Sequence, residues 1–274
     1  MKIRKPVRAL RLLFVFLIGS APVLQGGAWT QSKGHFYSKL TLINLNSTQR
    51  FAIDGNPTRG EFDDLALYFY GEYGITDNWT ITISNPVSKN SVGTYGSFRG
   101  TTRSFFAGDV EIGLKRSILK GPVVVSAVVG SKIPLFYETD AKPPLGTGKT
   151  DLDAKLLVGT SFYPIPAYMT GDIGYRHRSS QFEDEINYNF EAGYTLFKKY
   201  LVRGVLSGLR CTKNTLASMS DDQFSTEQEQ YRAGAGLIYL LSKNIEFDVT
   251  FLKTYAGRNF PRATEIYFGV AFKK

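Results

Sequence analysis

The chain has 274 residues with a single cysteine, and its 33 basic and 24 acidic residues give a formal net charge of +9. One cysteine, Cys211, excludes an intramolecular disulfide framework. Beyond residue 28 no run of 18 apolar residues occurs, which excludes helical membrane spans.

The first 28 residues have the pattern of an export signal. Five basic residues precede an apolar run of 7 residues, "LLFVFLI" at 12–18, and the small residues "GGA" follow at 26–28. Because the run is too short to cross a bilayer as a helix, we expect a signal peptide at 1–28, cleaved after Ala28, and one domain at 29–274. The remainder then carries 28 basic and 24 acidic residues, a charge of +4, which does not indicate a nucleic-acid partner.

Apolar and polar residues alternate through the rest of the chain. The segments "WTITIS" (79–84), "EINYNFEAGYTLF" (185–197) and "NIEFDVTFLK" (244–253) each place apolar side chains on one face of a strand. A soluble β-sandwich shows the same alternation with strands of about 5–6 residues, whereas a transmembrane strand needs about 9–11. In chain order the predicted strands lie near 35–46, 63–74, 79–86, 107–119, 122–133, 151–162, 167–178, 185–197, 200–210, 228–240, 245–255 and 263–273.

The connections between these strands alternate in length. Short turns are predicted at 75–78, 119–122, 163–166, 198–199 and 242–244, and longer connections at 47–62, 87–106, 134–150, 179–184, 211–227 and 256–262. Short periplasmic turns that alternate with longer external loops are typical of bacterial outer-membrane barrels. We therefore predict an all-β fold, a closed antiparallel transmembrane β-barrel of about 12 strands in the outer membrane. Its expected partners are outer-membrane lipid, lipopolysaccharide and the barrel assembly machinery.

Charged residues on the polar faces of the strands form the candidate lumen lining. On the lipid face an arginine or lysine at the bilayer midplane would cost about 2–4 kcal/mol, so these side chains are expected to point inward. The set is Asp64, Glu72, Glu111, Lys115, Asp153, Lys155, Asp172, Arg176, Glu191, Arg203, Arg232, Glu246, Asp248 and Glu265. The pattern favours ion pairs that brace a narrow interior with a small pore, and a wider polar path for a solute stays open as the alternative. Both signs are present, so no strong ion selectivity is expected.

No catalytic, cofactor-binding or metal-ligating residues are predicted. The segment "LGTGKT" (145–150) has Pro143 where a phosphate loop requires glycine, and a strand pattern follows it instead of a helix. His35 and His177 are too few for a multi-histidine metal site. His177 with Ser179 or Ser180 is a formal candidate for a lipid hydrolase, and exposed histidines are the favoured interpretation.

Several segments resemble one group of proteins. They are "GAWTQSKGHFYSKL" (27–40), "YGEYGITDNWTI" (70–81), "GDVEIGLKRSIL" (108–119), "LGTGKTDLDAKLLVGTSF" (145–162) and "GDIGYRHR" (171–178). They resemble outer-membrane barrels of Gram-negative bacteria linked to the meta-pathway of phenol degradation, and the first is similar to XagA-like relatives linked to biofilm or exopolysaccharide loci. One departure is that Lys273 and Lys274 follow Phe272, where such barrels commonly end on an aromatic residue.

This resemblance implies a channel or transporter for small solutes, aromatic compounds among them. The alternative is a non-conducting envelope barrel associated with exopolysaccharide or biofilm, and an outer-membrane lipid hydrolase is the remote alternative.

Overall fold

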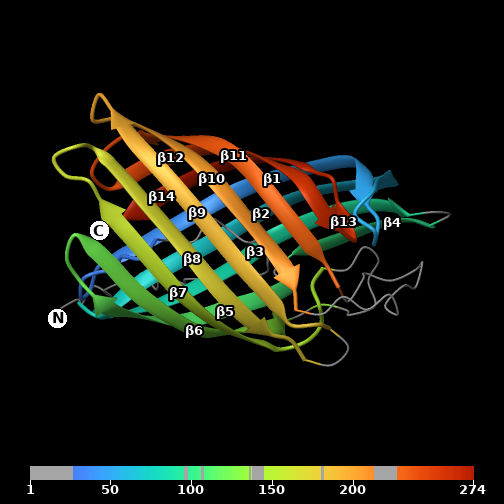
Figure 1. The fold of residues 1–274 in the computed structure, drawn as a ribbon, viewed down its shortest axis with the longest axis horizontal. Helices are drawn as coiled ribbons and strands as arrows, with labels where there is room; N and C mark the ends of the chain where they lie inside the picture. The colour runs from blue at the N-terminus through green and yellow to red at the C-terminus, as the bar shows by residue number, and fades with distance from the viewer. Residues whose placement is uncertain are drawn as a thin grey trace, which may run out of the picture.

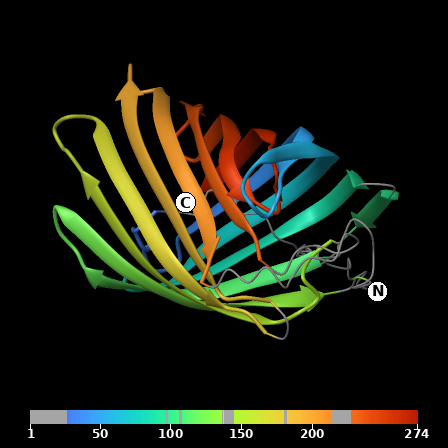
Figure 2. The ribbon, with the colours of Figure 1, turned by 45° about the vertical axis from the view of Figure 1, so that its right-hand side comes forward.

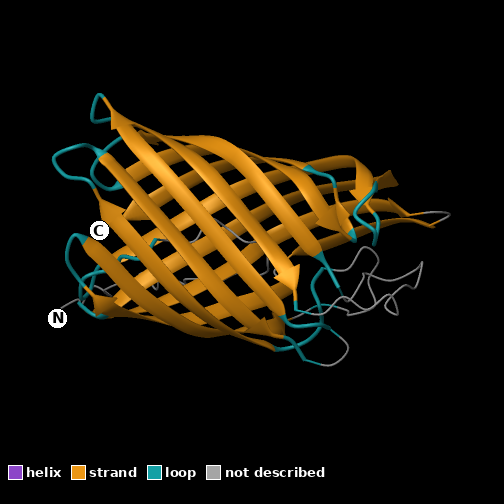
Figure 3. Cartoon of the chain, viewed as in Figure 1, coloured by secondary structure: helices purple, strands orange, loops and turns teal. Residues whose placement is uncertain are grey.

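The computed structural model describes residues 27–95, 98–105, 108–135, 137, 145–179, 182–212 and 227–274. Strands joined by turns make up this part of the chain (Figure 3). The strands are β1 Phe36–Phe51, β2 Pro57–Thr76, β3 Trp79–Tyr95, β4 Phe98–Phe105, β5 Gly108–Leu119, β6 Val123–Leu135, β7 Asp151–Ser161, β8 Ala167–His177, β9 Glu185–Leu196, β10 Tyr200–Cys211, β11 Glu229–Leu240, β12 Ile245–Arg258, β13 Phe260–Pro261 and β14 Thr264–Lys273. Among these residues no helix has the length and apolarity that a membrane crossing requires. Residues 1–26 of the expected signal peptide lie outside the described ranges.

The strands close into an antiparallel barrel (Figures 1 and 2). Each wall strand pairs with the next along the chain, and β1 pairs with β14 from Tyr37–Lys273 to Asn46–Thr264 to complete the ring. Twelve strands form this wall, with β4 and β13 as short additions that pair with β3 and β1. A closed ring leaves no sheet edge exposed, as a bilayer requires of membrane-spanning strands. The predicted fold class is confirmed.

Two stretches expected as external loops, 47–62 and 87–106, form strand hairpins instead, and most of a third, 256–262, belongs to the end of β12 and to β13. The stretch 47–62 continues β1 and β2 around a turn at 52–56, where Gly55 has φ 82° and the backbone N–H of Asn56 donates to the Asp54 carboxylate at 2.9 Å. Asp-Gly is a strong hairpin signal. The stretch 87–106 is largely a second hairpin, in which β3 pairs with β4. Both hairpins extend past the apolar part of the wall, so their strands lack the alternation on which the prediction depended.

Burial alternates along the wall strands with a period of two. In β12 the buried residues are Glu246, Asp248, Thr250 and Leu252, and the exposed residues are Phe247, Val249 and Phe251. The outward face is therefore apolar, as lipid contact requires, and the inward face is mostly polar. Exposed aromatic side chains also gather near one end of the barrel, as an interfacial girdle would place them: Tyr73, Phe162, Tyr163, Phe197 and Tyr200.

The short turns share one end of the barrel with both ends of the described chain (Figure 1). These turns span 77–78, 120–122, 162–166, 197–199 and 241–244. Because outer-membrane barrels keep their short turns in the periplasm, we call this end the periplasmic end and the opposite one the external end.

This orientation predicts the outcome of cysteine labelling. In a Cys211→Ala background, a cysteine at Asp54 should react on intact cells with a maleimide attached to a bulky polymer that cannot pass porins. A cysteine at Lys243, equally exposed but at the periplasmic end, should react only after the outer membrane is permeabilised. Labelling in the opposite order would show that the barrel is inserted the other way round.

Candidate functional site in the barrel interior

All fourteen charged residues predicted to line the lumen have buried or half-buried side chains. Most of them pair with each other or with neighbours that the sequence had not singled out. The direct pairs within the predicted set are Glu72–Lys115, Glu111–Arg176, Asp153–Arg176, Glu191–Arg203, Arg203–Asp248 and Arg232–Glu265. Asp64 pairs instead with Lys89, Glu246 with Lys273, and Asp172 with the side chain of Asn189. The interior is thus a set of ion-pair groups placed at different heights.

An N-terminal segment, residues 27–33, enters the periplasmic end of the barrel. Ala28 is 0% exposed and packs against Val124 and Leu157 on the inner wall. The hydroxyl of Ser126 on β6 donates to the carbonyl oxygen of Ala28 at 2.5 Å. The segment therefore occupies part of the interior, and it narrows the lumen at this end.

A buried ion pair holds this segment in place. Lys115 and Glu72 lie 2.6 Å apart, and their side chains are almost fully buried. The Lys115 ammonium also donates to the carbonyl oxygens of Gly27 at 3.1 Å and Trp29 at 3.3 Å. The Gln31 side-chain amide donates to the second oxygen of Glu72 at 2.8 Å. Since the pair bonds to three residues of the segment, wall and segment form one connected network.

A second group lies across the interior, also in the periplasmic half. The Arg203 guanidinium on β10 donates to Glu191 on β9 at 2.8 Å and to Asp248 on β12 at 2.7 Å. Lys39 on β1 forms a further ion pair with Asp248, and the Tyr168 hydroxyl donates to Glu191. Two cations thus face two carboxylates, so the group is formally neutral and joins five strands of the wall.

A third group spans the interior near the external ends of β5, β7 and β8. Arg176 on β8 donates to Asp153 on the adjacent β7 at 2.8 Å and to Glu111 on β5 at 2.6 Å. Because β6 and β7 lie between β5 and β8 in the wall, the contact with Glu111 spans the curved inner surface. Below it is a cavity of about 40 Å³ whose charged lining residues are Glu111, Lys115, Asp153 and Lys155. Such a volume has room for a few water molecules.

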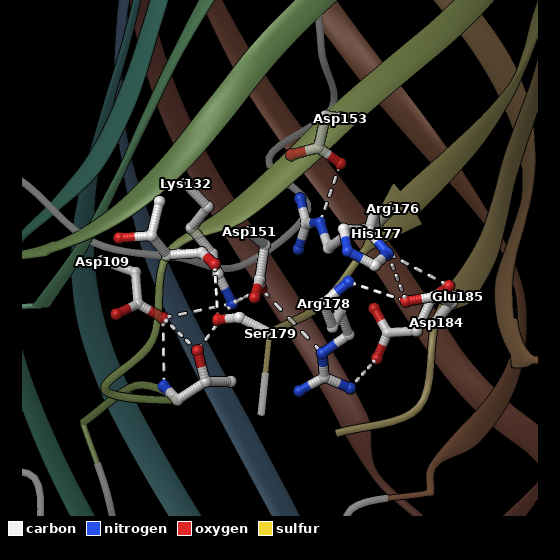
Figure 4. A network of polar contacts seen from close by, with 12 residues as sticks. Asp109, Lys132, Asp151, Asp153, Arg176, His177, Arg178, Ser179, Asp184 and Glu185 are labelled. Atoms are coloured by element: carbon white, nitrogen blue, oxygen red, sulfur yellow. Dashed lines mark hydrogen bonds and ion pairs between the residues drawn. The ribbon is translucent and has the colours of Figure 1, made fainter. Parts of the chain in front are cut away.

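A fourth group, at the external end of the barrel, holds the connection before β7 against β5 and β6 (Figure 4). Lys132 on β6 lies 2.6 Å from Asp151 and 3.4 Å from Asp109. The backbone N–H of Thr147 donates to Asp109 at 3.1 Å, and the Tyr137 hydroxyl donates to the same carboxylate. The segment "LGTGKT", which contains Thr147, is thereby a tethered external connection followed by strand β7.

The histidine considered for hydrolysis does not pair with Ser179. His177 Nδ1 lies 3.1 Å from an Asp184 oxygen, while the Ser179 hydroxyl donates to a backbone carbonyl at 2.7 Å. Ser180 lies outside the described residues. Partial burial opposes ionisation of Asp184, but the hydrogen bonds that its carboxylate accepts, His177 among the donors, keep its pKa below the ordinary value. His177 therefore helps to fix the turn before β9.

The interior also holds a group of aromatic residues that the charge-based prediction missed. Tyr37, Tyr68, Tyr70 and Tyr267 form this tyrosine patch; the last three belong to one buried cluster, and Tyr37 packs against it. The rings of Tyr37 and Tyr70 meet edge to face, with centroids 6.3 Å apart. Part of the tyrosine patch could have been predicted from the sequence. Tyr68 and Tyr70 alternate with other residues of β2 so that they lie on the same face of the strand as the predicted Glu72.

Comparisons with known proteins agree with this architecture. The sequence model of the family described as "Putative MetA-pathway of phenol degradation" matches residues 60–269. The COG4313 outer membrane channel from Pseudomonas putida F1 is similar in structure, with a TM-score of 0.68 and 12% identity over 91% of this chain and 98% of that one. The translocator domain of the autotransporter NalP from Neisseria meningitidis gives a TM-score of 0.49 and 9% identity over 88% and 89%. A comparison with curated protein sequences gave no match. The fold is that of an outer-membrane barrel.

Proposed function

The chain belongs to the phenol-degradation family, and from this premise we propose that it is an outer-membrane channel for small solutes, with aromatic compounds as the first class to test. The observation that carries the proposal is the composition of the interior. The tyrosine patch lies among charged groups inside a closed barrel, with Tyr70 and Tyr267 each hydrogen-bonded to a buried carboxylate. Tyr68, Tyr70 and Tyr267 are only 1–3% exposed and Tyr37 is half-buried, so the ring of Tyr37 is the part of the patch that an aromatic solute would contact first.

The same interior suits a narrow channel better than a wide pore. Ion pairs of both signs face the lumen, so neither anions nor cations are strongly favoured. The N-terminal segment fills part of the periplasmic end. The proposed function is passage of solutes without covalent chemistry, in keeping with the separate hydrogen-bond partners of His177 and Ser179.

Planar-bilayer recording of the refolded protein tests the proposal. We expect small discrete conductance steps from the complete mature chain and larger steps from a variant that lacks residues 27–31, because the deletion removes the backbone that occupies the periplasmic end. Lys243→Ala, an exposed change at the same end, is the matched control and should conduct like the parent.

Liposome swelling with benzoate, an aromatic anion, should then exceed swelling with a non-aromatic solute of similar size. Closed traces from both the parent and the deletion variant would instead favour the non-conducting envelope barrel.

A further inference from the structure

One side of the inner wall is dry. The buried cluster that contains most of the tyrosine patch draws its side chains from β10, β12, β14, β1 and β2, and each of them is at most 4% exposed. Two of its members, Val205 and Leu252, lie on either side of Gly234 in the sheet. A Cβ at Gly234 would lie 2.8 Å from Leu252 Cδ2, so the leucine leans over the glycine. The cluster thus leaves water little access to this side.

The opposite side, formed by β5 to β9, is more open. Five inward-facing polar residues in this arc are half-buried: Asp153 and Lys155 on β7, Asp172 on β8, and Asn187 and Asn189 on β9. Gly174 on β8 pairs with Lys155 on one side and with Asn187 on the other. A Cβ at Gly174 would lie 2.5 Å from Asn187 Oδ1 and 2.6 Å from Lys155 Cγ. Both side chains therefore lie over Gly174, which forms the floor between them.

This open side continues the cavity below the Arg176 group. Gly113 and Gly130, which pair across β5 and β6, line the cavity together with Asp153 and Lys155. Lys155 also interacts electrostatically with Glu111 above it and with Asp172 on β8. We call the cavity and the five half-buried polar residues the polar groove.

We propose that the polar groove is the water-filled surface that the polar part of a solute contacts, and that Lys155 is the residue that contacts a carboxylate. The inference rests on the proposed channel function. An ammonium, carboxylates and two side-chain amides in the groove can replace the hydrogen bonds that a carboxylate or hydroxyl group makes with water. The dry side offers no such exchange at Arg232 and Glu265, which pair with each other and are each 4% exposed.

Cysteine accessibility tests the contrast between the two sides. In a Cys211→Ala background, refolded in lipid vesicles, Asn189→Cys in the groove should react with a small charged methanethiosulfonate. Val205→Cys faces inward on the adjacent β10, is 2% exposed, and should stay unmodified. Intact mass counts the adducts, and gel mobility without boiling shows that each variant is folded. Equal reaction at both positions, or reaction at neither, would overturn the groove.

A second pair of variants repeats the comparison in case one of the first pair does not fold. Asn187→Cys lies in the groove, and Thr250→Cys on β12 replaces a side chain that is 1% exposed. Labelling does not depend on conductance, so closed bilayer traces would contradict the channel function while the labelling contrast would still support the groove. Where the parent conducts, an adduct at position 189 should reduce the conductance steps, and unchanged steps would place the solute path elsewhere.

The role of Lys155 has its own test. Lys155→Gln should lower the uptake of benzoate into liposomes relative to benzyl alcohol, a neutral compound of similar size, because the variant lacks the ammonium that faces the carboxylate. Lys253→Gln, an exposed change on the outer face of β12, is the matched control and should keep the parental ratio. A parental ratio in Lys155→Gln as well would overturn the assignment of this residue.

Discussion

Replacing Arg203 by alanine is expected to lower the free energy of unfolding by about 3–5 kcal/mol, the cost of removing one partner from a dry ion pair. The Arg203 side chain is 5% exposed and bonds to both Glu191 and Asp248. Lys39 still neutralises Asp248 in the variant, but Glu191 loses its cation and keeps only the Tyr168 hydroxyl among these partners. The destabilisation therefore originates mainly from an uncompensated carboxylate inside the barrel.

Strand β10 offers a matched control for this prediction. Arg210 also pairs with a carboxylate, Glu229 at 3.6 Å, but its side chain is 62% exposed. An exposed ion pair contributes about 0–1 kcal/mol, so Arg210→Ala should change the free energy of unfolding very little. Urea unfolding in lipid vesicles, followed by tryptophan fluorescence and by gel mobility without boiling, measures both variants. Equal losses of unfolding free energy in the two variants would mean that water reaches the Arg203 group as readily as it reaches Arg210 at the external end.

The Arg203 variant should also change the ion preference of any conductance. The substitution removes a positive charge from the periplasmic half of the interior and leaves Glu191 in place. The reversal potential under a salt gradient should therefore move towards cation preference. Arg210→Ala, at the opposite rim, should leave it unchanged.

The strand alternation was sufficient to predict the barrel, because it puts charged and apolar residues on opposite faces of each strand. Phe247, for example, lies between the charged residues Glu246 and Asp248, and a strand has only two faces on which to place them. The same rule could have placed Lys39 and Tyr68 inside, since each shares a face with other buried residues of its strand. The predicted set left them out because it contained the charged residues of only some strands and no aromatic residues.

Other features depend on the closed ring and could not be read from one strand. Glu111 and Arg176 meet only because the wall curves across β6 and β7, which no local pattern specifies. The N-terminal segment was equally hidden, because "GAWTQ" has no strand period and its position depends on partners such as Lys115. Gly159 is part of that arrangement, since a Cβ there would lie 2.8 Å from the Trp29 ring.

An arginine on the lipid-facing side should impair insertion according to its depth. Phe251 lies near the middle of β12 and is 46% exposed on the outward face. Phe251→Arg should therefore carry the midplane penalty of about 2–4 kcal/mol. Phe247 is equally outward-facing but only two residues from the start of the strand. Phe247→Arg can direct its guanidinium to the interface, so its penalty should fall towards about 0–1 kcal/mol.

The folded yield of both variants in lipid vesicles, measured by gel mobility without boiling, provides the comparison. Because the two positions share a strand, a face and a residue type, their difference isolates depth in the bilayer. A folded yield that is low for Phe251→Arg and close to the parental yield for Phe247→Arg would place the hydrocarbon layer around the middle of β12. Equal yields near the parental value would show that this face does not contact hydrocarbon, and the assignment of inner and outer surfaces would then have to be reversed or abandoned.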